Sequence, residues 1–179
     1  MIFEETDFCG CYIILPEVHG DSRGWFARTY CKNEFAQINH TQEWVQMNHS
    51  YSATKGTLRG MHFQKYPHSE IKLVRCISGA IYDVIVDLRK DSETYLKWLG
   101  VELNAQNKKQ LYIPEGFAHG FQTLTQDAEV IYLHSKYYAK DSEEGLRYND
   151  PLLNIVWPLT ISEVSARDLK HPLLDIPIP

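Results

Sequence analysis

Short runs of strand-forming residues recur along the chain, separated by glycine, proline and asparagine. Runs rich in β-branched and aromatic residues between such turn formers are typical of antiparallel all-β proteins. Their near-regular spacing predicts an all-β sandwich or jelly roll. No repeat, low-complexity tract or linker divides residues 1–179, so we expect a single domain. The expected strands are residues 11–15, 24–30, 43–48, 57–64, 71–77, 80–88, 97–103, 110–113, 119–124 and 129–138.

The strongest local signal spans residues 71–88. Two β-rich runs there are separated by the turn dipeptide Ser78-Gly79, which predicts a hairpin. Side chains alternate along a strand, so the second run has two distinct faces. One face carries Ile81, Asp83, Ile85 and Asp87, and the other carries Tyr82, Val84, Val86 and Leu88.

Helical signals are short. We expect helical turns at residues 32–38 and 162–169. Residues 149–158 are expected to be irregular, because each proline removes a hydrogen-bond donor and biases its predecessor away from helix. The tail from Pro172 onward is expected to lie extended over the surface.

Charge and cysteine content narrow the classes of function. A net charge of −5 argues against a general nucleic-acid binder. Cys9, Cys11, Cys31 and Cys76 lack zinc-like spacing, so we expect unlinked thiols in a reducing compartment. With no signal-peptide pattern and no apolar stretch near about 20 residues, we expect a cytoplasmic protein without a membrane partner.

Residues 58–75 concentrate cations around one histidine. Arg59, His62, Lys72 and Arg75 stand among apolar and aromatic residues. Such an environment opposes charging of the imidazole and suits a histidine that handles a proton beside a bound anion. Several positive charges inside a barrel require anionic partners or a ligand. His62 is therefore a candidate catalytic residue rather than only a packing histidine.

A carboxylate that orients His62 is expected, as in many histidine-dependent sites. Asp168 is one candidate, and Asp83 and Asp87 are rivals because their strand face is able to point inward. The sequence does not choose among the three.

The polar side chains elsewhere are weak candidates when taken singly. Tyr132 lies in a strand, where a core or rim position is the ordinary alternative to an acid. Gln46 and Asn48 share a strand face and are able to bind a polar ligand together. Arg23 follows a turn, where an arginine is usually solvated.

Six segments taken together carry a family resemblance. In the order in which they occur, the segments are Asp21-x-Arg23-Gly24-x-Phe26, Gln46-x-Asn48-x-Ser50, Leu58-Arg59-Gly60-x-His62-x-Gln64, Lys72-Leu73-Val74-Arg75, Gly116-Phe117-Ala118-His119-Gly120-Phe121 and Asn149-Asp150-Pro151. With these segments, the chain resembles the dTDP-4-dehydrorhamnose 3,5-epimerases from about residue 10 to residue 172.

The resemblance implies a cupin-like jelly roll, a homodimer, and catalysis without a metal or organic cofactor. The implied substrate is a nucleoside-diphospho-4-keto-6-deoxy sugar, whose C4 carbonyl acidifies the hydrogens at C3 and C5. By position, His62 matches the base, Asp168 its carboxylate partner and Tyr132 the acid on the other face. Lys72 would stabilise the developing oxyanion.

The remaining implied roles concern binding. Arg59 matches a family residue that contacts the nucleotide or diphosphate, and the planar guanidinium of an arginine suits phosphate geometry. Tyr138 matches an aromatic that stacks on the thymine ring. The further implied binding residues are Arg23, Gln46, Asn48, Arg59, His119, Glu143 and Arg167.

Three residues depart from the family pattern. Tyr148 in place of a usual tryptophan is a mild packing change, and the other two bear on the site. Arg28 stands where the family usually has a glutamate that contributes to nucleotide binding, and an arginine has no acceptor for a base N–H. Glu70 replaces a usual glutamine and would lower the field of Lys72. The departure at Arg28 leaves the identity of the nucleotide open.

A metal site is the main competing interpretation. Pro114-x-Gly116-x-x-His119 matches part of a cupin metal motif, but His62 has no second histidine two residues on. Two imidazoles without a paired carboxylate make a poor divalent site, so we expect no catalytic metal.

The residues leave four competing functions open. They are an epimerase acting at C3 or C5 alone, a ketoisomerase, a metal-dependent cupin oxygenase and a catalytically silent sugar-nucleotide binder. For the homodimer, the residues themselves offer only the apolar segment 11–15, which could add a strand to a partner's sheet.

Overall fold

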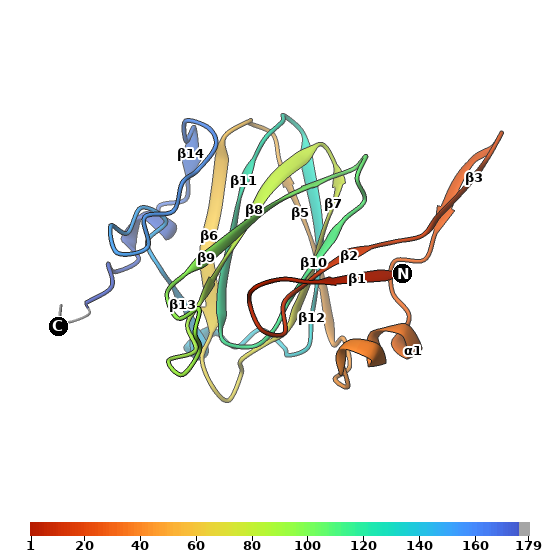
Figure 1. Ribbon diagram of the computed structural model, residues 1–179. Helices are drawn as coiled ribbons and strands as arrows, with labels where there is room; N and C mark the ends of the chain where they lie inside the picture. Colours follow the sequence, from red (N-terminus) through yellow and green to blue (C-terminus); the bar gives the residue numbers. More distant parts are fainter. Residues whose placement is uncertain (176–179) are drawn as a thin grey trace.

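The computed structural model describes residues 1–175, which form two six-stranded sheets packed face to face (Figure 1). The strands are β1 (Ile2–Glu5), β2 (Tyr12–Leu15), β3 (Val18–Asp21), β4 (Gly24–Ala27), β5 (Gln46–Ser52), β6 (Thr57–Gln64), β7 (Lys72–Ser78), β8 (Ala80–Asp87), β9 (Trp98–Asn104), β10 (Gln110–Ile113), β11 (Phe117–Thr123), β12 (Ala128–His134), β13 (Glu143–Gly145) and β14 (Glu163–Val164). The helical segments are α1 (Lys32–Phe35), η1 (Ala36–Ile38), η2 (Lys140–Ser142) and η3 (Asp168–Lys170).

The first sheet has the order β1-β2-β10-β7-β12-β5, and the second has the order β13-β6-β11-β8-β9 with β14 added beside β6. Inward side chains of both sheets form one core, which includes Val74 from β7, Ile85 from β8 and Phe121 from β11. The predicted all-β jelly roll is confirmed. The alternation predicted for β8 is confirmed too, since Ile81 and Ile85 lie in this core and Val84 and Val86 pack on the opposite face.

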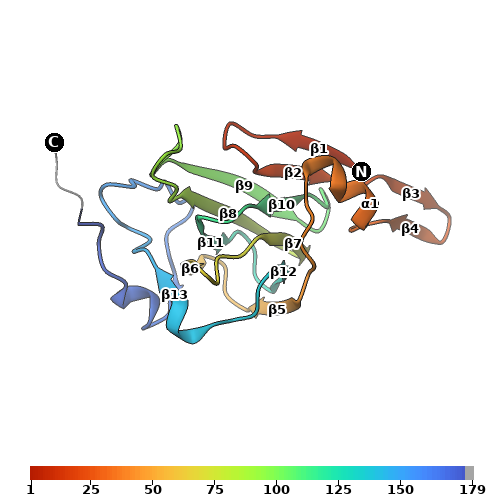
Figure 2. The ribbon, with the colours of Figure 1, turned by 90° about the horizontal axis from the view of Figure 1, so that it is seen from below.

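Each outer sheet face is covered by a different part of the chain (Figure 2). Phe35 of α1 is fully buried against Ile14 and Tyr112 of the first sheet. Leu146 and Leu153, from the chain that follows β13, cover the second sheet. These layers leave the inner faces of the two sheets to form the core and, at one end, a pocket.

The predicted hairpin of residues 71–88 is wrong in its pairing, although both of its strands exist. β7 pairs with β10 and β12 in the first sheet, whereas β8 pairs with β11 and β9 in the second. Gly79 lies at the crossing with φ +68°, where a Cβ would lie 2.3 Å from the Thr125 hydroxyl oxygen. A turn dipeptide marks a chain reversal but does not specify the partner strand, and here the chain passes between sheets.

The two helix predictions had different outcomes. Residues 32–38 form α1 and η1 as predicted. Residues 162–169 do not form the predicted helix, because Val164 pairs with Leu58 of β6 and only η3 follows. Residues 149–158 are irregular, as predicted. The predicted extended tail includes residues 176–179, which lie outside the described residues.

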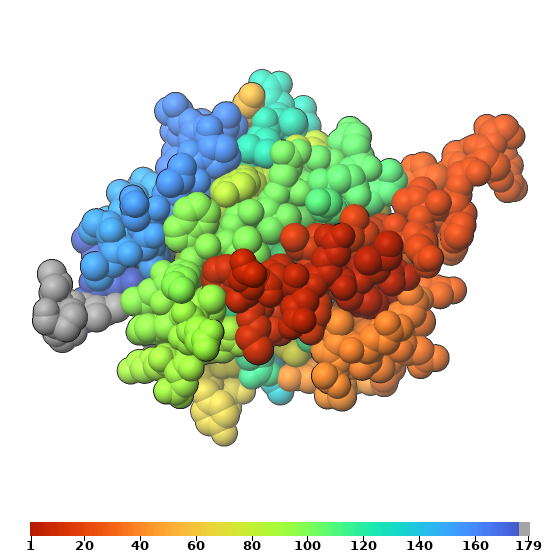
Figure 3. All heavy atoms as spheres, in the orientation of Figure 1, coloured from red at the N-terminus to blue at the C-terminus, as the bar shows by residue number. Residues whose placement is uncertain are grey.

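The N-terminal segment does not offer the free strand that the sequence indicated. β2 lies between β1 and β10, so both of its edges are already paired. Instead, β3 and β4 form a two-stranded hairpin that stands away from the sheets (Figure 3). Phe26 and Trp25 on this hairpin are 65% and 54% exposed.

Within residues 1–175, no helix is long and apolar enough to cross a membrane. The four cysteines are free, with Cys11 and Cys76 buried and Cys9 exposed.

Candidate active site

A pocket of about 800 Å³ opens between the two sheets. Eleven of the twelve predicted site residues line it, and they come from both sheets, from the loop after β12 and from the segment around η3. They are Gln46, Asn48, Arg59, His62, Lys72, His119, Tyr132, Tyr138, Glu143, Arg167 and Asp168.

His62 and Asp168 form a hydrogen-bonded pair in this pocket. His62 Nε2 lies 2.8 Å from Asp168 Oδ1, although 106 residues separate them in the chain. Asp168 Oδ2 accepts the Gly60 backbone N–H at 3.1 Å. Gly60 approaches β11 so closely that a Cβ there would lie 2.6 Å from Gly120 Cα. Glycine at this position therefore lets β6 present both the donor to Asp168 and, two residues on, the imidazole.

The Asp168 side chain is only 3% exposed, and it is charged. Burial alone would raise its pKa, but the hydrogen bond and charge of His62 and the Gly60 N–H lower it to about 2. Arg167 also approaches His62 Nε2, at 3.0 Å. A guanidinium only donates, so this contact competes with the carboxylate for the same nitrogen. The buried carboxylate requires a proton on Nε2, which leaves His62 Nδ1 as the free acceptor.

The two rival aspartates are engaged elsewhere. Asp83 Oδ1 lies 2.7 Å from His119 Nε2, and Asp87 accepts hydrogen bonds from Arg89, Ser92 and Thr94. His119 is the register partner of His62 across β6 and β11. The structure thus pairs Asp168, of the three candidates, with His62.

Tyr132 reaches the same pocket from the opposite sheet. It lies on β12, next to Asn48 of β5 in the strand register, whereas His62 lies on β6. Burial raises the pKa of the Tyr132 hydroxyl, so this group holds its proton at neutral pH. The two candidate proton-transfer groups therefore come from two facing sheets.

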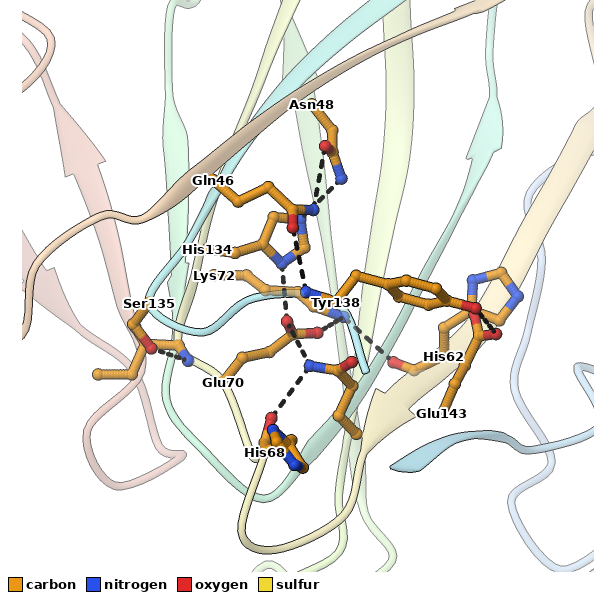
Figure 4. Close-up of polar contacts among 12 residues, drawn as sticks. Gln46, Asn48, His62, His68, Glu70, Lys72, His134, Ser135, Tyr138 and Glu143 are labelled. Atoms are coloured by element: carbon orange, nitrogen blue, oxygen red, sulfur yellow. Dashed lines mark hydrogen bonds and ion pairs between the residues drawn. The ribbon is translucent and has the colours of Figure 1, made fainter. Parts of the chain in front are cut away.

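Lys72 lies in the pocket with a 9% exposed side chain. Its ammonium donates to Glu70 Oε1 at 3.1 Å and, more weakly, to the His62 carbonyl at 3.4 Å (Figure 4). A buried cation beside His62 is placed to stabilise negative charge that develops on a ligand there.

Polar residues at the rim of the pocket are held by hydrogen bonds. Glu143 accepts from the Tyr138 hydroxyl and from Arg167, both at 2.9 Å. Gln46 Oε1 accepts the Tyr138 backbone N–H at 3.1 Å. Arg59 donates separately to Ser52 Oγ at 3.0 Å. These contacts fix the predicted binding residues around the opening before any ligand arrives.

Arg23 is the predicted site residue that the structure does not bring to the pocket of its own chain. It lies at the tip of the β3–β4 hairpin, bonded to Asp21, with an 87% exposed side chain. Arg28 lies at the base of that hairpin and donates to Glu34 at 2.7 Å.

Comparison with known proteins identifies the family. A family model described as dTDP-4-dehydrorhamnose 3,5-epimerase matches residues 5–175. The chain belongs to this family.

Individual relatives agree along nearly the whole chain. A dTDP-4-dehydrorhamnose 3,5-epimerase from Salmonella typhimurium is 46% identical over 177 residues, covering 98% of this chain and 96% of its own length. A crystal structure of the Bacillus anthracis enzyme, with TDP and PPi bound, is 46% identical with a TM-score of 0.94, covering 97% and 99%. A Legionella pneumophila structure in complex with dTDP-4-keto-L-rhamnose is 38% identical with a TM-score of 0.91, covering 96% and 92%.

The residues that line the pocket of this epimerase-family chain but were absent from the predicted site include Glu70 and His134. His134 follows Tyr132 by two residues on β12, so the strand period placed it on the same face. Glu70 stood out in the sequence only as a departure near Lys72. Another residue that the prediction missed, His171, lies in irregular chain after η3, where no periodicity indicates which way a side chain points.

His171 completes a cluster with the dyad. One ligand-type atom from each of His62, Asp168 and His171 lies within 4.8 Å of the others, a spacing that could hold a metal ion. The 2.8 Å contact, however, places a proton on His62 Nε2 rather than a lone pair. Since a metal-bound imidazole nitrogen must be unprotonated, this hydrogen bond favours an acid–base dyad over a ligand set.

Proposed function

We propose that the pocket inverts C3 and C5 of dTDP-4-keto-6-deoxy-D-glucose and yields dTDP-4-keto-L-rhamnose, without metal or organic cofactor. One structural observation supports the assignment of this reaction to particular residues. The His62–Asp168 pair and the Tyr132 hydroxyl enter one pocket from facing sheets, with the Lys72 ammonium beside them. Such an arrangement suits removal of a proton from one face of a sugar and its return to the other.

His62 Nδ1 removes the hydrogen at C3 as a proton. The C–H electron pair forms a C3–C4 double bond, and the π pair of the C4 carbonyl moves onto its oxygen to give an enolate. Asp168 stabilises the resulting imidazolium through Nε2, and its charge is already fixed by the Gly60 N–H. Tyr132 donates its proton to C3 from the opposite face, which inverts the centre. His62 then releases its proton to solvent and Tyr132 regains one. The same groups are then able to repeat the step at C5, since that carbon is also adjacent to the C4 carbonyl.

Lys72 stabilises the enolate oxygen. The Lys72 side chain is largely buried, so its attraction for the enolate oxygen is weakly screened by water and grows as the oxygen becomes negative. Removing one such group typically lowers the rate about 10²- to 10³-fold.

The nucleotide part of the substrate is assigned to the rim of the pocket. Arg59, Arg167 and His119 supply positive or donor groups for the diphosphate, and the exposed ring of Tyr138 offers a stacking face for the base. Gln46, Asn48 and Glu143 complete the polar lining of this end.

We infer that the protein is a homodimer in which the β3–β4 hairpin contacts a second copy. A two-stranded hairpin is marginal in water, and this one exposes Trp25 and Phe26. Arg23 lies outside the pocket of its own chain, so its predicted nucleotide contact requires that a second copy receive the hairpin. We further propose one domain over residues 1–179 and, from the four free thiols, a cytoplasmic location.

Product stereochemistry tests the proposed reaction. Purified, chelator-treated protein is incubated with dTDP-4-keto-6-deoxy-D-glucose, and the product is reduced with borohydride, hydrolysed and analysed by chiral chromatography. L-rhamnose together with its C4 epimer is expected. A product with only C3 or only C5 inverted would show a single-site epimerase, and activity lost on chelation but restored by a metal would support a metal-dependent enzyme.

A further inference from the structure

A buried chain of polar side chains joins Lys72 to the part of the pocket formed by β5 (Figure 4). Glu70, just before β7, contacts Lys72 through Oε1 at 3.1 Å. Its second oxygen, Oε2, lies 2.9 Å from His134 Nδ1 and 3.1 Å from Gln64 Nε2. The side chains of Glu70 and His134 are each only 8% exposed.

The hydrogen-bond donors and acceptors of these linked side chains are consistent with one placement of the protons. Asn48 Nδ2 donates to His134 Nε2 at 3.2 Å, so the Nδ1 of a neutral His134 carries the proton that Glu70 accepts. Asn48 Oδ1 in turn accepts from Gln46 at 3.1 Å. The polar atoms that link the β5 side chains to the Lys72 ammonium therefore meet partners of the opposite type.

The charges of Glu70 and Lys72 show how these hydrogen-bonded side chains are able to act on Lys72. An ammonium that is desolvated and unpaired loses its proton or moves toward water. Burial would raise the pKa of Glu70, but its hydrogen bond from His134 and the charge of Lys72 lower it, so the carboxylate stays ionised beside the ammonium. The remaining Lys72 contact, to the His62 carbonyl, is long at 3.4 Å and cannot fix the side chain alone.

We propose that Glu70 and His134 are positioning residues for Lys72, holding its side chain in place and aimed at the oxygen that becomes negative during catalysis. Neither residue is required to touch the substrate for this role. The inference rests on the proposed function of Lys72 as the group that stabilises the enolate.

A double-mutant cycle tests the inference with Glu70→Gln, Lys72→Met and the double variant. Glu70→Gln keeps the side chain's shape, removes its charge and installs the glutamine usual in the family. The sequence indicated that the Glu70 charge would lower the field of Lys72, but the 3.1 Å contact makes this carboxylate the group that holds the ammonium in this chain. We expect kcat to fall roughly 10- to 100-fold, the range for misplacing a catalytic group, while KM stays within about twofold. In the Lys72→Met background the same Glu70→Gln change is expected to leave kcat unaltered, because there is no ammonium left to position.

His134 provides a second, independent test. His134→Asn retains a side-chain N–H near the Nδ1 position, whereas His134→Leu removes it. We expect His134→Leu to lower kcat and His134→Asn to recover part of the loss. Glu144→Gln serves as the matched control, since Glu144 is an exposed partner of Lys65 on β13 and is expected to leave kcat within about twofold.

Folding is checked separately for each variant. Lys72→Met leaves Glu70 buried without its cation, which can prevent folding. If this single variant does not fold, the double variant, which lacks both charges, is the protein in which Lys72 is absent. In that case Glu70→Gln and the two His134 variants carry the test through the split between kcat and KM.

Each contrary outcome is distinct. An equal loss of kcat from Glu70→Gln with and without Lys72, or an effect on KM alone, overturns the inference and leaves the proposed reaction intact. An unchanged kcat in Lys72→Met overturns both the inference and the role of Lys72.

Discussion

His62 and His119 lie opposite each other on β6 and β11, and each is bonded to its own buried aspartate, at 2.8 Å to Asp168 and 2.7 Å to Asp83. The two pairs differ in access. The His62 side chain is 26% exposed toward the pocket, whereas that of His119 is 9% exposed. The more accessible imidazole is the one beside Lys72, which supports His62 as the base and His119 as a binding residue.

Replacing each histidine separates these roles. His62→Asn is expected to lower kcat by about 10²- to 10⁴-fold, the usual contribution of a general base, with the fold intact. His119→Asn is expected to act mainly on KM. Steady-state kinetics with circular dichroism as the folding control checks both, and comparable kcat losses in the two variants would contradict the assignment.

Tyr132→Phe removes the proposed acid and leaves the base in place. Since His62 still removes the C3 hydrogen, we expect solvent deuterium to enter at C3 while inverted product is lost. Mass spectrometry of the recovered substrate measures the exchange. Full epimerisation by this variant would assign the proton return to another group.

Acid stability is expected to depend on Asp87, which lies outside the pocket. Burial would raise its pKa, but hydrogen bonds from Arg89, Ser92 and Thr94 lower it to about 2. A folded-state pKa below the unfolded value of about 4 gives stability that is present above pH 4 and lost as pH falls through 2. The shift corresponds to about 2 kcal/mol.

Asp87→Asn is therefore expected to lower the free energy of unfolding by about that amount at pH 7, and by less at pH 3. Urea denaturation of both proteins at pH 7, 5 and 3 measures the difference. A loss that stays constant across this range would show that the charge of Asp87 does not contribute.

The hairpin assignment predicts an effect on assembly. Phe26→Glu places a charge on the exposed β3–β4 surface and is expected to shift the protein from dimer to monomer in sedimentation velocity. Glu4→Gln, on the exposed edge strand β1, serves as a control for a surface change elsewhere. A Phe26→Glu variant that remains dimeric would place the interface on another surface.

Alternation and glycine-bounded runs are local properties, so they predicted most of the strands but missed β1, β3, β13 and β14. The predicted residues that line the pocket came mainly from the family resemblance. The local patterns failed where the answer depended on a distant partner. The turn at Gly79 did not reveal that β7 and β8 enter different sheets. From the residues alone, the partner of His62 stayed open among three aspartates because Asp168 is 106 residues away, and the family resemblance was needed to point to Asp168. The pairing of Glu70 with His134, 64 residues apart, was not visible for the same reason.

Proton NMR in D2O is the most direct test of the central claim. Purified, chelator-treated protein is mixed with dTDP-4-keto-6-deoxyglucose, and the C3 and C5 proton signals are followed with time. Loss of both signals, with appearance of the L-configured product, is the predicted result. Unchanged signals at both carbons, with folded protein present, would contradict proton transfer at this pocket.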